Sequence, residues 1–99
     1  MLSITPESVI HFAITPVDFR KGINGLAALC KPLFATSSFS GHIFLFRNKR
    51  QTSVKLLAYD NNGFWLCQKR FSQGRIKGWP RHDTDAAAFT REALQRLLQ

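Results

Sequence analysis

The side chains that could perform acid–base or metal chemistry are few and widely spaced in this chain. The six carboxylates are Glu7, Asp18, Asp60, Asp83, Asp85 and Glu92. Metal-dependent nucleic-acid enzymes usually hold their ions with two or three convergent carboxylates. Asp18, Asp60 and Glu92 could be nominated, but no motif joins them. Helix capping explains Asp18 and Asp83 better, and a turn explains Asp60. We therefore expect no metal site, no catalytic residue and no enzyme.

The histidines and cysteines form no recognisable site either. His11, His42 and His82 are far apart, with no cysteine or histidine at the spacing of zinc ligands. Cys30 and Cys67 each lie in an apolar pattern, which is typical of buried free thiols in a reducing cytosol. The alternative for Cys67 is a nucleophile–base pair with His42 on an adjacent strand. The sequence has no P-loop, dinucleotide fingerprint or nucleophile elbow, so we expect no cofactor and no small-molecule substrate.

Basic side chains are the chemistry that the sequence does offer. The chain has 14 Lys and Arg against 6 Asp and Glu, a net charge of +8 and a pI of about 10.4. Between residues 20 and 81 there are twelve basic residues and one acidic residue, Asp60. Such a concentrated field favours a polyanion: DNA, RNA or an anionic membrane face. The alternative is a protein that its charge merely keeps soluble, but a clustered excess with a pI above 9 favours nucleic acid.

The candidate phosphate contacts are the cations that alternate with aromatic residues in the middle of the chain. They are Arg20, Lys21, Arg47, Lys49, Arg50, Lys55, Lys69, Arg70 and Arg75. Aromatic residues among cations on a sheet and its loops can hold single strands or a sugar-phosphate backbone. Trp79 lies beside them, and we interpret it as a core residue rather than a stacking platform.

Length and hydropathy indicate the number of domains and the location of the protein. A chain of 99 residues with 44% hydrophobic residues is expected to form one domain, 1–99, with a packed core. Its N-terminus lacks the basic start of a signal peptide, and no apolar run reaches the ~20 residues of a membrane helix. These features predict a cytoplasmic protein without a membrane partner.

The first part of the chain predicts a strand followed by a helix. The β-branched apolar run at 9–13 indicates a strand, and Thr15 and Pro16 a turn. Asp18 could cap a helix whose apolar face recurs at helical spacing and which Pro32 would end. The residues of that face are Phe19, Ile23, Leu26, Ala27 and Cys30.

Three segments rich in aromatic and β-branched residues then predict an antiparallel meander. They span 42–46, 54–60 and 64–71, with short connections at 48–52 and 61–63. Asn62 and Gly63 favour a two-residue hairpin turn. That turn would pair Asp60 with Trp65 and place Lys55 opposite Arg70. Like charges that face each other repel, unless an anion lies between them.

A second helix is expected to begin near Asp83 or Thr84, with an apolar stripe of Phe89, Ala93, Leu94 and Leu97. The predicted fold class is therefore α+β. It comprises a three- or four-stranded antiparallel β-meander, extended by the early strand, with two packed helices.

An ordered series of short motifs also carries a family resemblance. The motifs are 18–22 (DFRKG), 25–29 (GLAAL), 39–50 (FSGHIFLFRNKR), 54–57 (VKLL), 59–60 (YD), 63–64 (GF), 69–71 (KRF), 74–75 (GR) and 79–80 (WP). Their order and spacing resemble the short accessory proteins that insertion-sequence-66 transposable elements encode in their second open reading frame, the TnpB type.

The resemblance implies a role in DNA transposition. Members of that family are encoded beside the transposase, a separate chain that carries the catalytic carboxylates, and are thought to assist transposition. The expected function is therefore a non-enzymatic accessory protein of transposition that binds DNA through its basic meander. The alternative is a protein–protein adaptor that docks on the transposase of the same element.

Overall fold

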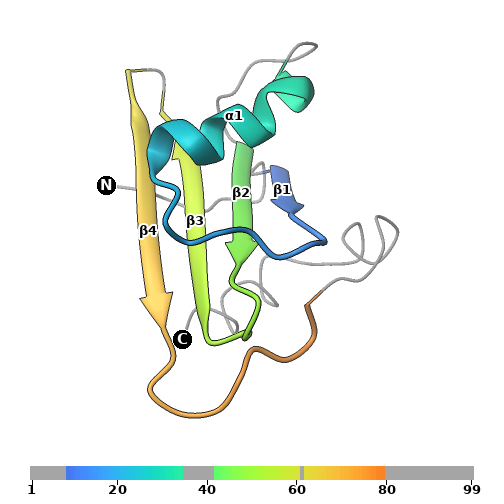
Figure 1. Ribbon diagram of the computed structural model, residues 1–99. Helices are drawn as coiled ribbons and strands as arrows, with labels where there is room; N and C mark the ends of the chain where they lie inside the picture. The colour runs from blue at the N-terminus through green and yellow to red at the C-terminus, as the bar shows by residue number, and fades with distance from the viewer. Residues whose placement is uncertain (1–8, 35–41, 61, 80–99) are drawn as a thin grey trace.

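One helix lies across one face of a four-stranded sheet (Figure 1). A computed structural model describes residues 9–34, 42–60 and 62–79. The elements are β1 (Val9–Phe12), α1 (Ile23–Phe34), β2 (His42–Arg47), β3 (Ser53–Tyr59) and β4 (Phe64–Arg70). The strands lie in the order β1-β2-β3-β4, so β1 and β4 form the edges. Within the described ranges the chain is thus α+β, as predicted.

The predicted antiparallel meander is confirmed for β2, β3 and β4. Each pairs antiparallel with the next, in the order of the sequence. β3 is the most deeply buried strand, because it is central and covered on both faces. Its sequence, SVKLLAY, is accordingly an almost continuous apolar run rather than an alternating one. Lys55 is the exception in that run.

The prediction of a wholly antiparallel sheet is wrong, because β1 pairs parallel with β2. Val9 lies opposite His42, and Phe12 lies opposite Leu45. Parallel neighbours need a crossover connection of a dozen or more residues, usually through a helix. The segment between β1 and β2 contains α1 and is long enough for that. The sheet is therefore mixed, and β1 belongs to a β–α–β unit rather than to the meander.

The predicted helix forms, but its boundaries differ. The Asp18 carboxylate accepts a hydrogen bond from the Arg20 amide at 2.9 Å, and the Asp18 carbonyl accepts one from the Lys21 amide at 3.1 Å. These bonds close a turn at 18–21, so the helix begins only at Ile23. Asp18 caps that turn and not the helix, and Arg20 and Lys21 precede the first helical turn. At the other end, the helix passes Pro32 and ends at Phe34.

The predicted register between β3 and β4 is wrong by two residues. The Asp60 amide donates to the Gly63 carbonyl at 3.1 Å, and the last strand pair is Tyr59 with Phe64. The Asp60–Gly63 bond therefore closes the connection one residue earlier in the chain than the turn that Asn62 and Gly63 predict. Trp65 lies opposite Ala58, and Lys55 lies opposite Gln68 rather than Arg70. The two cations do not face each other, so no anion is needed between them.

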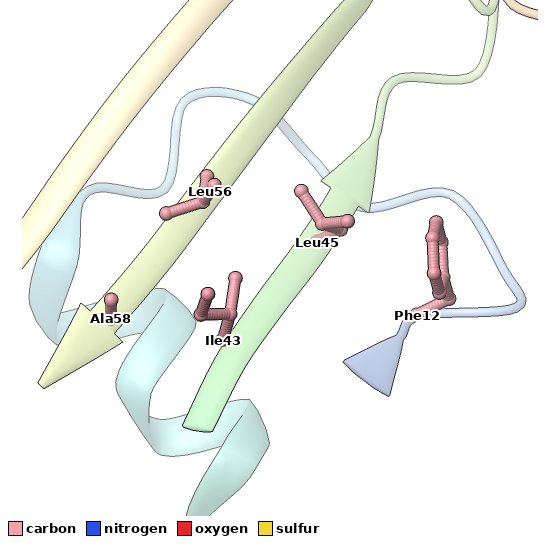
Figure 2. Packing of buried hydrophobic residues seen from close by; sticks show 5 residues of the cluster. All are labelled: Phe12, Ile43, Leu45, Leu56 and Ala58. Carbon is pink, nitrogen blue, oxygen red and sulfur yellow. The ribbon is translucent and has the colours of Figure 1, made fainter. Parts of the chain in front are cut away.

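The sheet has a hydrophobic cluster on each face. Under α1, Leu26 and Cys30 pack against Phe44, Phe46 and Leu57. On the opposite face, the second cluster is Phe12, Ile43, Leu45, Leu56 and Ala58, which point the same way from three strands (Figure 2). Trp79 packs on this second cluster, with its ring edge-to-face against Phe12 at 5.1 Å between centroids. The interpretation of Trp79 as a core residue is confirmed.

The second predicted helix, from Asp83 or Thr84 onwards, lies outside the described residues. Among the described residues, no helix is long and apolar enough to cross a membrane.

Candidate nucleic-acid interface

Two connections meet at the end of the sheet where β2 and β4 finish and β3 begins. The Phe71 amide donates to the Thr52 carbonyl at 2.9 Å, and the Ile76 amide donates to the Gln51 carbonyl at 2.7 Å. These bonds tie the segment after β4 to the turn between β2 and β3, at the lower end of the sheet in Figure 1. Residues 19 and 25 positions apart in sequence are thereby joined into one surface.

Asn48 builds the β2–β3 turn from within. Its side-chain carbonyl accepts hydrogen bonds from the amides of Thr52 at 2.9 Å and Ser53 at 3.1 Å. Its side-chain amide donates to the Thr52 hydroxyl at 2.8 Å. Gln51 closes the turn with a φ of 61°, a left-handed conformation that costs energy for a residue other than glycine. The turn is therefore held in one shape by a side chain, which fixes the positions of the cations on it.

Seven basic residues lie at this end of the sheet, which we call the basic end. They come from the end of β2, the β2–β3 turn, the end of β4 and the segment after it. They are Arg47, Lys49, Arg50, Lys69, Arg70, Arg75 and Lys77. Six of them belong to the predicted contact set, and Lys77 does not. The structure thus gathers these cations at one end of the sheet instead of spreading them over one face.

Most of these cations are open to solvent. Lys49, Arg50, Arg70, Arg75 and Lys77 are exposed, whereas Arg47 and Lys69 are half-buried. The Lys69 ammonium lies over the Phe71 ring, 5.5 Å from its centroid. Arg47 is the most enclosed: its Nη1 donates to the Asn48 carbonyl at 3.2 Å, and its Nε is buried without a hydrogen-bond partner among the described residues.

Lys55, another predicted contact, has an internal role instead. Its side chain is only 6% exposed. Its ammonium donates to the carbonyls of Phe19 and Lys21, both at 2.9 Å, and lies 4.9 Å from the centroid of the Phe19 ring. A buried ammonium with these partners is not available to a phosphate. Lys55 therefore anchors the turn before α1 to the sheet.

Arg20 and Lys21 lie on that same anchored turn, and both are exposed. The Arg20 guanidinium holds both oxygens of Asp18, with the shortest contact 2.7 Å between Nη2 and Oδ2. These hydrogen bonds lower the pKa of Asp18 to about 2. Because the pair neutralises itself, Arg20 adds little to the external field, whereas Lys21 adds a full charge.

The acidic residues of the described ranges are Asp18 and Asp60. Asp60 lies at the other end of the sheet, in the β3–β4 loop. There it accepts a hydrogen bond from the Trp65 indole at 2.7 Å, which lowers the pKa of the Asp60 carboxyl. One of these two carboxylates is paired to Arg20 and the other lies at the far end, so neither of them offsets the seven cations of the basic end.

The cysteines and histidines differ in part from the prediction. Cys30 is buried as predicted, and burial raises the pKa of its thiol to about 11. Cys67 is exposed, because it lies on edge strand β4. It cannot pair with His42 on an adjacent strand, since β3 separates the two. Among the described residues, no group of three His, Cys, Asp or Glu is placed to hold a metal ion.

The sequence-based prediction left out Lys77 and Asn48 at the basic end, and His11 on β1. Lys77 lies between Gly74 and Gly78, and its position depends on the Ile76–Gln51 hydrogen bond. Asn48 between two strands is a recognisable turn signal, and that pattern could have revealed its role. His11 donates to or accepts from His42, with 2.9 Å between Nε2 and Nδ1, because the parallel pairing of β1 brings the rings together.

Comparisons with known proteins place these observations in a context. The chain is similar to the family described as IS66 Orf2 like protein, whose model matches residues 8–99. It is 38% identical over 67 residues to "Uncharacterized protein y4jC" of Sinorhizobium fredii (strain NBRC 101917 / NGR234), covering 68% of this chain and 57% of that protein. It is 30% identical over 89 residues to "Uncharacterized protein y4hO" of the same organism, covering 90% and 76%. The match thus spans little more than half of the first relative. No solved structure matches.

Proposed function

Because the chain belongs to the IS66 Orf2-like family, we propose that it is a non-enzymatic, cytoplasmic accessory protein of transposition that binds DNA through its basic end. The family supports a role associated with transposition. The mode of action proposed here rests on the geometry of the cations and not on the relatives.

One observation carries the proposal: within residues 9–34, 42–60 and 62–79, seven cations from separate segments share one end of the sheet, with no carboxylate among them. Backbone hydrogen bonds and the Asn48 side chain hold the segments together before any ligand arrives. Cations that are already held in position can bind the phosphates of a nucleic-acid backbone and release their counterions. That release is the main source of sequence-independent affinity. DNA is the polyanion that the family context favours.

The structure also revises the set of proposed contacts. Arg47, Lys49, Arg50, Lys69, Arg70 and Arg75 remain, and Lys77 joins them. Lys21 is exposed on the turn before α1 and can supply a peripheral contact. Arg20 contributes less, because Asp18 holds its guanidinium. Lys55 is left out because it is buried and occupied by two carbonyls.

A salt titration tests this proposal. The full chain is added to fluorescently labelled duplex DNA, and to a single strand of the same length, over a range of salt concentrations. If about four to six phosphates are contacted, log K against log salt should fall with a slope near −4 to −5 for duplex. Absence of binding at low salt, or binding that salt leaves unchanged, would refute a basic-end interface.

Charge-removal variants locate the interface. Arg50→Gln removes an exposed cation of the basic end, and Lys31→Gln removes the same charge from α1. Arg50→Gln should weaken binding several-fold and make the slope shallower by about one unit. Lys31→Gln should change the affinity and the slope much less. Equal effects of the two variants would mean that only net charge matters, and not the basic end.

A separate observation favours the adaptor as a second candidate. Trp65 is 41% exposed on β4, the last strand of the described sheet. An exposed tryptophan on an edge strand suits a protein contact, because such strands can pair and aromatic residues are enriched in interface cores. If the protein docks on the transposase of its element, the two should co-purify from nuclease-treated lysate, and Trp65→Ser should reduce the yield. No co-purification would count against this role.

A further inference from the structure

A pocket opens at the basic end between three segments of the chain. It has a volume of about 650 Å³, and its lining includes Arg47, Gln51, Lys77, Gly78 and Trp79. Gln51 has a φ of 61° and Gly78 a φ of 77°, so two left-handed residues shape its wall. The volume lies within the range of pockets that hold small ligands, roughly 300–1,000 Å³.

Arg47 is the cation of this pocket whose guanidinium is held in place. Its Nη1 donates to the Asn48 carbonyl at 3.2 Å, which fixes one edge of the guanidinium. Its Nε is buried and has no hydrogen-bond partner within the described part of the chain. An unpaired buried donor is costly and uncommon, and on a charged group the cost is greater. Because Nε itself has almost no solvent-accessible surface, an acceptor that enters the pocket would bind the Nη groups of the guanidinium.

The lining specifies the charge of that acceptor. Arg47 and Lys77 are both cationic, and no carboxylate is among the described residues of the lining. Gln51 adds a side-chain amide that can also donate a hydrogen bond. Guanidinium groups match the oxygens of a phosphate, and an ammonium adds a point charge beside them. The pocket therefore suits an oxyanion.

The remaining walls of the pocket suit the sugar that is attached to a phosphate in a nucleic acid. The Trp79 indole donates to the Ala13 carbonyl at 2.9 Å and packs against Phe12, so its ring is fixed. Ile14 and Ile76 also line the pocket. A sugar next to the phosphate would lie against these apolar surfaces. This combination fits a phosphodiester better than a bare anion.

We propose that this pocket, the Arg47 pocket, binds one phosphate of a bound nucleic-acid strand, with Arg47 as the principal donor and Lys77 as the second cation. The inference rests on the proposed function for the source of that phosphate. Free inorganic phosphate shares the chemistry and is the other source. The exposed cations would then supply diffuse attraction, and the Arg47 pocket a fixed contact.

Three single variants of the full chain test the role of the pocket. Arg47→Gln and Lys77→Gln each remove a cation of the lining, and Arg75→Gln removes an exposed cation of the same segment that is outside it. Arg47→Gln should weaken DNA binding by about tenfold, as expected for a lost hydrogen bond to a charged group. Lys77→Gln should weaken it more than Arg75→Gln does. Because Lys77 is exposed, its variant tests the pocket even if Arg47→Gln fails to fold.

Binding of inorganic phosphate to the pocket is tested separately, by thermal denaturation. At equal ionic strength, about 50 mM phosphate should raise the melting temperature of the wild type over chloride by about 2–5 °C. The rise should vanish in Arg47→Gln and Lys77→Gln and persist in Arg75→Gln.

The outcomes separate the two proposals. If DNA binds but the pocket variants behave like Arg75→Gln and phosphate has no effect, the Arg47 pocket is refuted and the proposed function stands. If DNA does not bind but phosphate stabilises the chain through Arg47, the proposed function is refuted and the site takes free phosphate. If neither ligand binds, both proposals are wrong.

Discussion

Lys55 is a charged side chain whose role is structural. It is a buried cation in the central strand, and its ammonium joins two carbonyls of the turn before α1. The Phe19 ring beneath it adds a cation–π contact at 4.9 Å. A buried charge is tolerated only when its hydrogen-bonding capacity is met, and here backbone carbonyls meet it. The excess of basic residues in the sequence therefore does not translate directly into positive surface, because Lys55 is counted in it and is buried.

Replacement of Lys55 should cost stability rather than only affinity. Lys55→Met keeps the length of the side chain but leaves the carbonyls of Phe19 and Lys21 without their donor. We expect the free energy of unfolding to fall by about 2–3 kcal/mol, measured by urea denaturation. Lys49→Met, at an exposed turn position, should change it by no more than about 0.5 kcal/mol. A similar loss in both variants would contradict an anchoring role for Lys55.

The histidine pair at the edge of the sheet should make stability depend on pH. Burial and the nearby His42 lower the pKa of His11 below its ordinary value of 6.5. The unfolded chain thus takes up a proton near pH 6.5 that the folded chain resists, so stability should fall as pH drops below that value. The loss should level off below the folded pKa of His11. In urea denaturation at pH 7.5 and 5.5, His11→Gln should show a smaller difference than the wild type. An unchanged difference would assign the pH dependence to other groups.

At the scale of elements, the β2–β3 turn is where local structure governs the proposed interface. Asn48→Ala removes three side-chain hydrogen bonds from the turn and should lower stability by about 1–3 kcal/mol. It should also weaken DNA binding, because Lys49 and Arg50 would lose their fixed positions.

Asn48→Asp separates the two effects. It keeps the oxygen that accepts from Thr52 and Ser53, so most of the stability should remain. It adds a negative charge to the basic end, so the affinity for DNA should still fall. Denaturation and DNA titration of both variants check this, and an Asn48→Asp protein that binds DNA like the wild type would argue against the interface.

The elements differ in how far sequence could predict them. The meander was predictable because aromatic and β-branched runs alternate with short polar connections. The register of β3 and β4 was not, because the Asp60–Gly63 hydrogen bond closes the connection one residue earlier than the turn that Asn62 and Gly63 favour. The parallel pairing of β1 was not predictable from local pattern either. It depends on how a connection of about thirty residues folds back over the sheet, and nothing in a four-residue strand encodes that.

At the scale of the whole molecule, charge is divided between the two ends of the sheet. Of the residues that the structure describes, seven cations lie at the basic end, whereas Asp60 and the exposed Trp65 lie at the other end. Hairpin reasoning could place Lys49 and Arg50 together, because both belong to one turn. It could not place Lys77 or the unpaired Nε of Arg47 beside them, since tertiary hydrogen bonds and the packing of Trp79 create that neighbourhood. The charge excess was thus predictable, but its arrangement at one end was not.

The two tryptophans of the chain can report which end binds DNA. Trp79 lines the Arg47 pocket at the basic end, and Trp65 contacts Asp60 at the other. If DNA binds the basic end, it should quench the fluorescence of Trp79 and leave that of Trp65 nearly unchanged. Trp65→Phe should therefore keep most of the quenching seen in the wild type, and Trp79→Phe should lose it. Because Trp79 packs on the core, circular dichroism must first show that Trp79→Phe remains folded. Quenching that followed Trp65 instead would move the DNA contact to the exposed face of β4, and the basic end would then act only as a source of long-range attraction.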